Sequence, residues 1–125
     1  MIKETIITKK APKAIGPYSQ GIKVGNVVYT SGQLPIDPET GEMPDNIEEQ
    51  TRMSLENLKN VIEAAGASLQ QVIKTTVFLS DMNHFAVMNH VYEEFFSDNY
   101  PARSAIEVAR LPKDAFIEIE AIAMI

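Results

Sequence analysis

The sequence predicts an α+β fold in which two helices pack on one face of a mixed β-sheet. Short apolar runs that are rich in β-branched residues and bounded by turn-forming residues predict the strands. Two longer segments carry apolar residues at three- and four-residue spacing, which predicts amphipathic helices. Along the chain these segments follow the order β-ββ-α-β-α-β-β, and this order favours the α+β class.

The size of the chain predicts a single domain, residues 1–125. Its 125 residues and apolar fraction of 45% are sufficient for a hydrophobic core. There is no cysteine, which excludes disulfides, thiolate catalysis and cysteine-ligated metal sites. Because no apolar stretch approaches a membrane span and the N-terminus lacks a signal-like apolar region, we expect a soluble, cytoplasmic protein with no membrane partner.

Charge argues against nucleic acid as a partner. Acidic residues outnumber basic ones, 17 against 11, and the formal net charge is −6. Proteins that bind nucleic acid usually carry a basic stripe that displaces counterions from the phosphates. The lysines of this chain are scattered and form no such stripe.

The first third of the chain predicts three strands. An extended segment, Ile2–Thr8, precedes a Gly-Pro turn. The runs Gly21–Val24 and Val27–Ser31 flank Gly25-Asn26, which predicts a hairpin with a two-residue, II′-like turn. The following segment, 35–41, is dense in turn formers and should be a loop.

A helix should follow, with Asp45 as its N-cap and Glu48 completing the cap three residues later. Gly66 is a natural stop for this helix. Its expected buried stripe consists of Ile47, Thr51, Leu55, Leu58, Ile62 and Ala65.

The second half predicts a strand over Ile73–Ser80 and a second helix capped by Asp81. Two strands then end the chain, Arg103–Ala109 and Ala115–Ala123. The expected buried stripe of the second helix consists of Phe85, Met88, Tyr92 and Phe95.

Alternation along the last two strands divides their side chains into two faces. In the last strand, Glu118 and Glu120 share a face opposite Ile117 and Ile119. One face must pack on the helices, and we expect the other to combine apolar groups with Arg103 and the carboxylates. Such a mixed face suits a subunit interface that carries a few functional charges.

Arg103 is the leading candidate for a binding residue, because a guanidinium can hold a planar carboxylate by two parallel hydrogen bonds. The alternative is a structural ion pair with Glu118 or Glu107. Paired carboxylates such as Glu118 and Glu120 can divide acid and base roles, although solvent-facing glutamates are commoner.

Other side chains give weaker signals. Tyr18, Ser31 and Gly32 lie in or beside turns, where a ligand could approach the backbone. His84 and His90 are six residues apart on the second helix, which does not suit a shared metal ion, and we expect both to be exposed. No metal site is predicted.

Several motifs together resemble the RidA family, the reactive intermediate deaminase family also called YjgF. The resemblance extends from near the N-terminus to Ala123 without a large insertion. The motifs are Ala14-Ile15-Gly16-Pro17-Tyr18-Ser19-Gln20, Thr30-Ser31-Gly32-Gln33, Ala64-Ala65-Gly66-Ala67, Lys74-Thr75-Thr76-Val77-Phe78, Pro101-Ala102-Arg103-Ser104 and Glu107-Val108-Ala109-Arg110-Leu111-Pro112-Lys113-Asp114.

This resemblance implies a chorismate-mutase-like subunit that assembles as a homotrimer with clefts between subunits. It also implies hydrolysis of 2-aminoacrylate and related 2-imino acids to 2-oxo acids and ammonia, without a cofactor. Arg103 would bind the substrate carboxylate, and Glu118 would activate water and transfer protons. Tyr18 would line the pocket of a neighbouring subunit.

Ser31, Gly32 and the backbone at Ala105 would complete the hydrogen-bonding shell of the implied site. Many members of the family have cysteine where this chain has Ala105. We expect the change to be neutral, because a backbone N–H donates whatever the side chain. The resemblance also leaves two alternative functions open, because both are linked to some members of the family. One is a non-catalytic regulatory module that binds metabolites, and the other is an endoribonuclease or translation inhibitor.

Overall fold

The computed structural model describes residues 2–125 and contains one six-stranded sheet and two α-helices. The order of these elements is the predicted one, so the α+β fold class is confirmed. The strands are β1 (Lys3–Ile6), β2 (Gly21–Val24), β3 (Val27–Thr30), β4 (Val72–Leu79), β5 (Ala102–Glu107) and β6 (Ile117–Met124). The helices are α1 (Ile47–Ala64) and α2 (Phe85–Phe95), with short 3₁₀ turns at Leu69–Gln71, Met82–His84 and Pro112–Asp114.

The sheet has the strand order β1-β2-β3-β6-β4-β5, which leaves β5 at an edge. β4 and β5 pair in parallel and the other neighbours are antiparallel, so the sheet is mixed as predicted. Val24 pairs with Val27 across the predicted two-residue turn. Gly25 has a φ of 60°, a value that glycine adopts without strain and that suits the first turn position of a II′-like hairpin.

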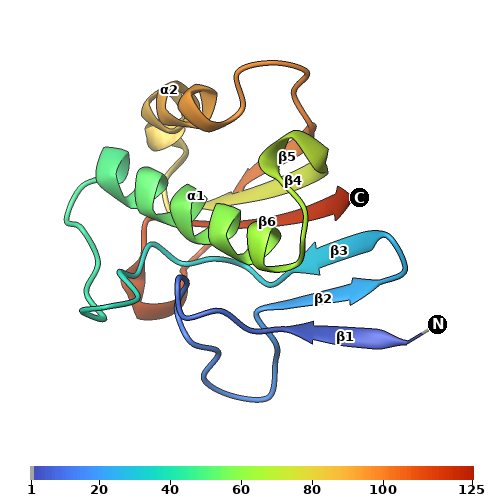
Figure 1. Ribbon diagram of the computed structural model, residues 1–125. Helices are drawn as coiled ribbons and strands as arrows, with labels where there is room; N and C mark the ends of the chain where they lie inside the picture. Colours follow the sequence, from blue (N-terminus) through green and yellow to red (C-terminus); the bar gives the residue numbers. More distant parts are fainter. Residues whose placement is uncertain (1) are drawn as a thin grey trace.

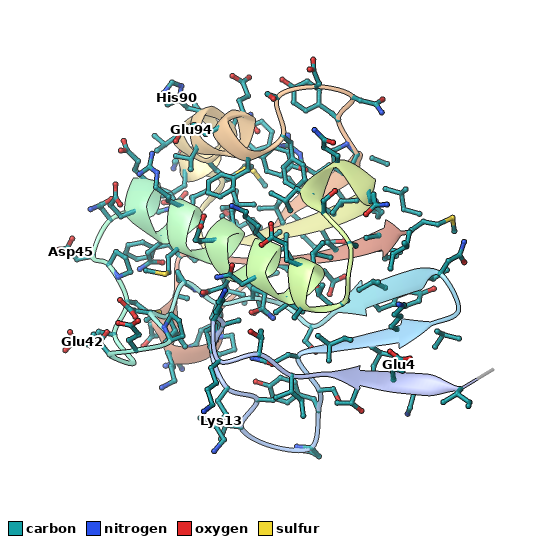
Figure 2. The ribbon with its side chains drawn as sticks, viewed as in Figure 1. Glu4, Lys13, Glu42, Asp45, His90 and Glu94 are labelled. Atoms are coloured by element: carbon teal, nitrogen blue, oxygen red, sulfur yellow. The ribbon has the colours of Figure 1, made fainter. Side chains whose placement is uncertain are left out.

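Helix α1 begins where predicted, but the residue that caps it is Asn46 and not Asp45. The Asn46 side chain accepts a hydrogen bond from the Glu49 backbone N–H at 2.8 Å. The sequence offers two possible caps, because glutamate stands three residues after both Asp45 and Asn46. Tertiary contacts favour the second one: Gln50 donates to the Pro44 carbonyl at 2.8 Å, and Asp45 points into solvent (Figure 2).

The end of α1 confirms Gly66 as its stop. Gly66 has a φ of 90° and its N–H donates to the Glu63 carbonyl, while the Ala67 N–H donates to the Ile62 carbonyl. This pair of hydrogen bonds is a Schellman motif. The helix lies across one face of the sheet, with α2 beside it (Figure 1), and buries Leu55, Leu58, Val61 and Ile62 completely.

Asp81 caps a 3₁₀ turn rather than α2 itself. Its carboxylate accepts from the Asn83 N–H at 2.9 Å, and α2 follows with His84 at its N-terminal boundary. The predicted stripe of α2 is partly correct: Met88 and Tyr92 are buried, whereas Phe85 and Phe95 are half-buried against the core. Contrary to expectation, only His90 is exposed; His84 is half-buried beside the ring of Phe116.

Each strand of the sheet presents one face to the helices and one face away from them. On β6, Ile117, Ile119, Ala121 and Ala123 are buried on the helix side, as alternation predicts. The opposite face, here called the open face, has no covering element among residues 2–125. Register and burial place on it Tyr29, Thr76, Phe78, Ser104, Ile106, Glu118, Glu120 and Ile122.

Neither α-helix described within residues 2–125 combines the length and the apolar character that a membrane span requires.

Candidate functional site

Glu118 lies on the open face, near the start of β6. It pairs with Phe78 on β4, which in turn pairs with Ile106 on β5, so its side chain stands in an otherwise apolar row. Burial, and secondarily the charge of Glu120, raise the pKa of the Glu118 carboxyl above its usual value of 4.5. A carboxyl in this state is suited to exchanging protons with a bound molecule.

Gly32 leaves the space that the Glu118 side chain occupies. The backbone of Gln33 exchanges two hydrogen bonds with Ile119, of 2.7 and 3.2 Å, and this bridge draws Gly32 alongside β6. A Cβ atom at Gly32 would lie 2.7 Å from Cδ and 2.9 Å from Cγ of Glu118. The need for glycine here is therefore steric, since the turn chemistry alone does not explain it.

Tyr18 and Ser31 reach the same cleft through a loop that Gln20 organises. The buried Gln20 amide donates to the carbonyls of Thr8 and Pro12, and the Ser31 hydroxyl donates to the Ser19 carbonyl at 2.5 Å. Tyr18 itself is 52% exposed. The structure thus brings together four of the predicted site residues, because one cleft is lined by Tyr18, Ser31, Gly32 and Glu118.

Two lysines that were not among the predicted site residues also line the Glu118 cleft, Lys13 and Lys113. Lys13 projects from the loop between β1 and β2 (Figure 2). Lys113 has a φ of 57°, an uncommon conformation for a residue other than glycine. Sequence alone gives no signal for this conformation, because neither neighbour of Lys113 requires it.

Arg103 lies elsewhere, on the helix side of the sheet. Its Nη1 donates to the Asn89 Oδ1 at 2.7 Å, and its Cζ lies 4.9 Å from the centre of the Tyr92 ring and 5.4 Å from that of Phe85. All three partners belong to α2. Arg103 and Tyr92 line a second cleft with Asn89, Glu93, Tyr100 and Pro101.

This position corrects the expected mixed face, which was to hold Arg103 together with the carboxylates. Arg103 pairs with Thr75, and Thr75 pairs with the buried Ala121, so all three share the helix side. Strand β5 has no clear apolar and polar alternation, and its sequence therefore could not specify which set of side chains faces the helices. Within one chain, Arg103 and Glu118 stand on opposite faces of the sheet.

The alternative role of Arg103, an ion pair with Glu118 or Glu107, is wrong for this chain. No carboxylate of residues 2–125 forms a salt bridge with Arg103. The Glu107 carboxylate instead accepts a hydrogen bond from the Met82 backbone N–H at 2.8 Å. Among residues 2–125, no carboxylate therefore lies within ion-pair distance of the Arg103 guanidinium.

Ala105 is two residues beyond Arg103 on the edge strand β5. Its methyl group packs against the hydrophobic core, opposite Val77. Because β5 has a neighbour on only one side, every second backbone N–H faces outward and is free to bind a ligand.

Asn89 was not among the predicted site residues, although the sequence carries a signal for it. Asn89 stands four residues after Phe85 and three before Tyr92, so it interrupts the apolar stripe of α2 with an amide. The described residues thus line two clefts, one with a guanidinium that forms no ion pair and one with a carboxyl whose pKa is raised. No group of three or more potential metal ligands occurs in residues 2–125.

Comparison with known proteins places this chain in a family. Residues 8–125 match the family model described as Endoribonuclease L-PSP. A RutC family protein of Pyrococcus abyssi is 60% identical over 98% of both chains, and a 2-iminobutanoate/2-iminopropanoate deaminase of Escherichia coli is 54% identical over 97% of both. The crystal structure of Escherichia coli TdcF with bound serine superposes with a TM-score of 0.95 at 52% identity, covering 98% of each chain. The chain belongs to the Endoribonuclease L-PSP family, also known as the YjgF or RidA family, as its motifs predicted.

Proposed function

We propose that this protein is an enamine/imine deaminase that hydrolyses 2-aminoacrylate, 2-iminopropanoate and 2-iminobutanoate to 2-oxo acids and ammonia. The observation that carries the proposal is Arg103, a guanidinium with neutral partners only, beside a cleft. Such a group suits the carboxylate that all these substrates share. The name of the Escherichia coli relative at 54% identity supports the same reaction.

Glu118 supplies the proton transfers in this proposal. The enamine first tautomerises to the imine, and water then attacks the imine carbon while Glu118 accepts a proton from it. Glu118 returns that proton to the nitrogen, which gives a carbinolamine bearing one hydroxyl and one amino group. It then transfers the hydroxyl proton to the amino group, so that the carbon–nitrogen bond breaks, the carbonyl forms and ammonia leaves. Because imines hydrolyse without a catalyst, orienting one water and binding the carboxylate are sufficient tasks, and no cofactor is required.

The site is completed across a subunit boundary in our proposal. Arg103 and Glu118 lie on opposite faces of the sheet, so one substrate meets both only if a second copy contributes one of them. The open face, with exposed Tyr29 and Ile106, suits contact with such a copy. A cytoplasmic homotrimer in which Tyr18 also reaches a neighbour's cleft is part of this proposal.

A coupled assay tests the proposed reaction. A serine or threonine dehydratase generates the enamine, and release of the 2-oxo acid is followed with and without this protein. We expect Arg103→Ala to lower kcat/KM by at least about a hundredfold, because charge-assisted hydrogen bonds to the carboxylate are lost. Arg52→Ala is the matched control, since Arg52 pairs with Glu94 on the helices and should leave activity unchanged. Undiminished activity of Arg103→Ala would refute the proposal.

The family description favours a second candidate, an endoribonuclease. The formal net charge of −6 argues against it. Cleavage of single-stranded RNA that falls steeply with salt and disappears in Arg103→Ala would support this candidate. A third candidate, a non-catalytic module that binds metabolites, predicts that Glu118→Gln keeps full ligand affinity while no acceleration of hydrolysis occurs even in the native protein.

A further inference from the structure

We propose that Asn89 is a positioning residue, whose neutral amide holds the Arg103 guanidinium in place while leaving its positive charge available to a substrate carboxylate. This inference rests on the proposed function, which it deepens by assigning a role to the partner of Arg103. The relevant contact is the 2.7 Å hydrogen bond from Arg103 Nη1 to Asn89 Oδ1.

The α2 groups that contact the guanidinium are uncharged, and Glu93, which lines the same cleft, forms no salt bridge with it. Tyr92 and Phe85 lie within cation–π distance, at 4.9 and 5.4 Å from Arg103 Cζ, and the Met88 sulfur lies 3.9 Å from Nη1. Among residues 2–125, Asn89 Oδ1 is the only oxygen that accepts a hydrogen bond from the Arg103 side chain. Together these contacts restrict the rotation of the arginine without neutralising it.

Tyr92 is itself fixed, so the support of Arg103 is anchored in the core. The Tyr92 hydroxyl and the Thr75 hydroxyl share a hydrogen bond of 2.8 Å, and Thr75 is completely buried. Thr75 is also the strand partner of Arg103. Burial raises the pKa of the Tyr92 phenol, so its ring remains uncharged at neutral pH.

Arg52 on α1, which also contacts α2, provides a contrast to Arg103. Its guanidinium forms ion pairs with Glu48, Glu49 and Glu94. A carboxylate in that arrangement competes with an incoming anionic ligand for the same donors. An amide oxygen occupies one N–H of Arg103 and leaves the other donors, and the whole charge, for the ligand.

If the neutral amide of Asn89 is what matters, replacing it with a carboxylate should affect stability and ligand binding in opposite directions. Asn89→Asp should leave the Tm unchanged or raise it, because a half-buried arginine gains an ion pair. The same substitution should weaken binding of 2-oxobutanoate, the product carboxylate, by at least about tenfold, because the new charge competes with the ligand. Asn89→Ala should weaken binding less than Asn89→Asp, since it frees the side chain without neutralising it.

Calorimetric titration of the full-length protein with 2-oxobutanoate and thermal melts of each variant measure these effects. Asn83→Asp is the matched control, because it makes the same chemical change at an exposed position just before α2 and should bind like wild type. In the dehydratase-coupled assay, Asn89→Asp should raise KM with a smaller effect on kcat.

The outcomes separate this inference from the proposed function. If wild type binds 2-oxobutanoate without accelerating imine hydrolysis, the deaminase proposal fails, and the order of affinities among the variants still decides the role of Asn89. The inference would be overturned if Asn89→Asp bound 2-oxobutanoate with wild-type affinity, or if its binding weakened only in proportion to a lowered Tm. It would also be overturned if the wild-type protein did not bind 2-oxobutanoate.

Discussion

Glu118 illustrates at the residue scale how surroundings set chemistry. Its position on a strand predicts an ordinary exposed carboxylate, yet the apolar row around it and Glu120 beside it raise its pKa. Gly32 makes this position possible, because any side chain there would meet the Glu118 carboxyl group. The two residues therefore act as one steric unit although they are far apart in sequence.

The raised pKa of Glu118 predicts a dependence of stability on pH. A carboxyl with a higher pKa in the folded state binds its proton more tightly there, so its contribution is complete below the unfolded-state pKa and is lost as pH rises through the folded-state pKa. Glu118→Gln stays neutral, and its Tm relative to wild type should rise across this window towards neutral pH. Thermal melts over a pH series measure this, with Glu56→Gln on the exposed side of α1 as the control. An equal Tm difference at every pH would contradict the raised pKa.

Gly32→Ala should lower kcat by about tenfold or more, because the new methyl group displaces the Glu118 carboxyl from the cleft. The obstructing atoms belong to a side chain that can rotate, so the loss of stability should stay within about 1–2 kcal/mol. Denaturant unfolding of Gly32→Ala, Glu118→Ala and the double variant forms a cycle that measures the contact. Additive effects would show that the two positions do not interact.

At the scale of elements, α1 connects the sheet to the loops around the Glu118 cleft. The buried Asn57 amide donates to the carbonyls of Leu34 and Ile36 at 3.0 and 2.9 Å, and both of these loop residues line the cleft. One turn earlier, the buried Ser54 hydroxyl has no hydrogen-bond partner within residues 2–125. The helix thus places two buried polar groups close together, of which Asn57 holds the loop and Ser54 does not.

Ser54→Ala should stabilise the protein by about 1 kcal/mol, because an unpaired buried hydroxyl is removed and alanine favours the helix. Asn57→Ala is the contrasting variant, since it leaves two loop carbonyls unpaired and should cost about 2–3 kcal/mol. Chemical denaturation of both variants measures the difference. Destabilisation by Ser54→Ala would mean that its hydroxyl has a partner in the assembled protein.

At the scale of the whole molecule, the sheet separates the two chemical groups of the proposed site. Arg103 is held by α2 on one face, and Glu118 stands on the other face beside Gly32. A single copy therefore has two separate clefts, each with one of the two groups that the proposed site requires. The exposed apolar residues of the open face give the chain a surface on which another copy can complete them.

Mixed oligomers test this separation directly. Arg103→Ala and Glu118→Gln should each be inactive alone, but co-refolding the two should restore activity, because some interfaces then combine an intact Arg103 with an intact Glu118. Random mixing in equal amounts should regenerate about a quarter of the wild-type sites. Each variant co-refolded with itself is the control. A mixture that stays inactive would mean that one chain contributes both groups.

The sequence by itself determined the elements, their order and the alternation along β6, because spacing, caps and turn residues act over a few neighbours. The family motifs also placed Tyr18, Ser31 and Gly32 among the candidates, and the alternation along the last strand drew attention to Glu118. Only the tertiary structure decided that Asn46 caps α1 and that Arg103 faces α2 beside Asn89. It also decided that Glu118 lies on the opposite face of the sheet from Arg103. These depend on strand register and helix packing, in which residues distant along the chain fix one another, and β5 lacks the apolar alternation that would have indicated its orientation.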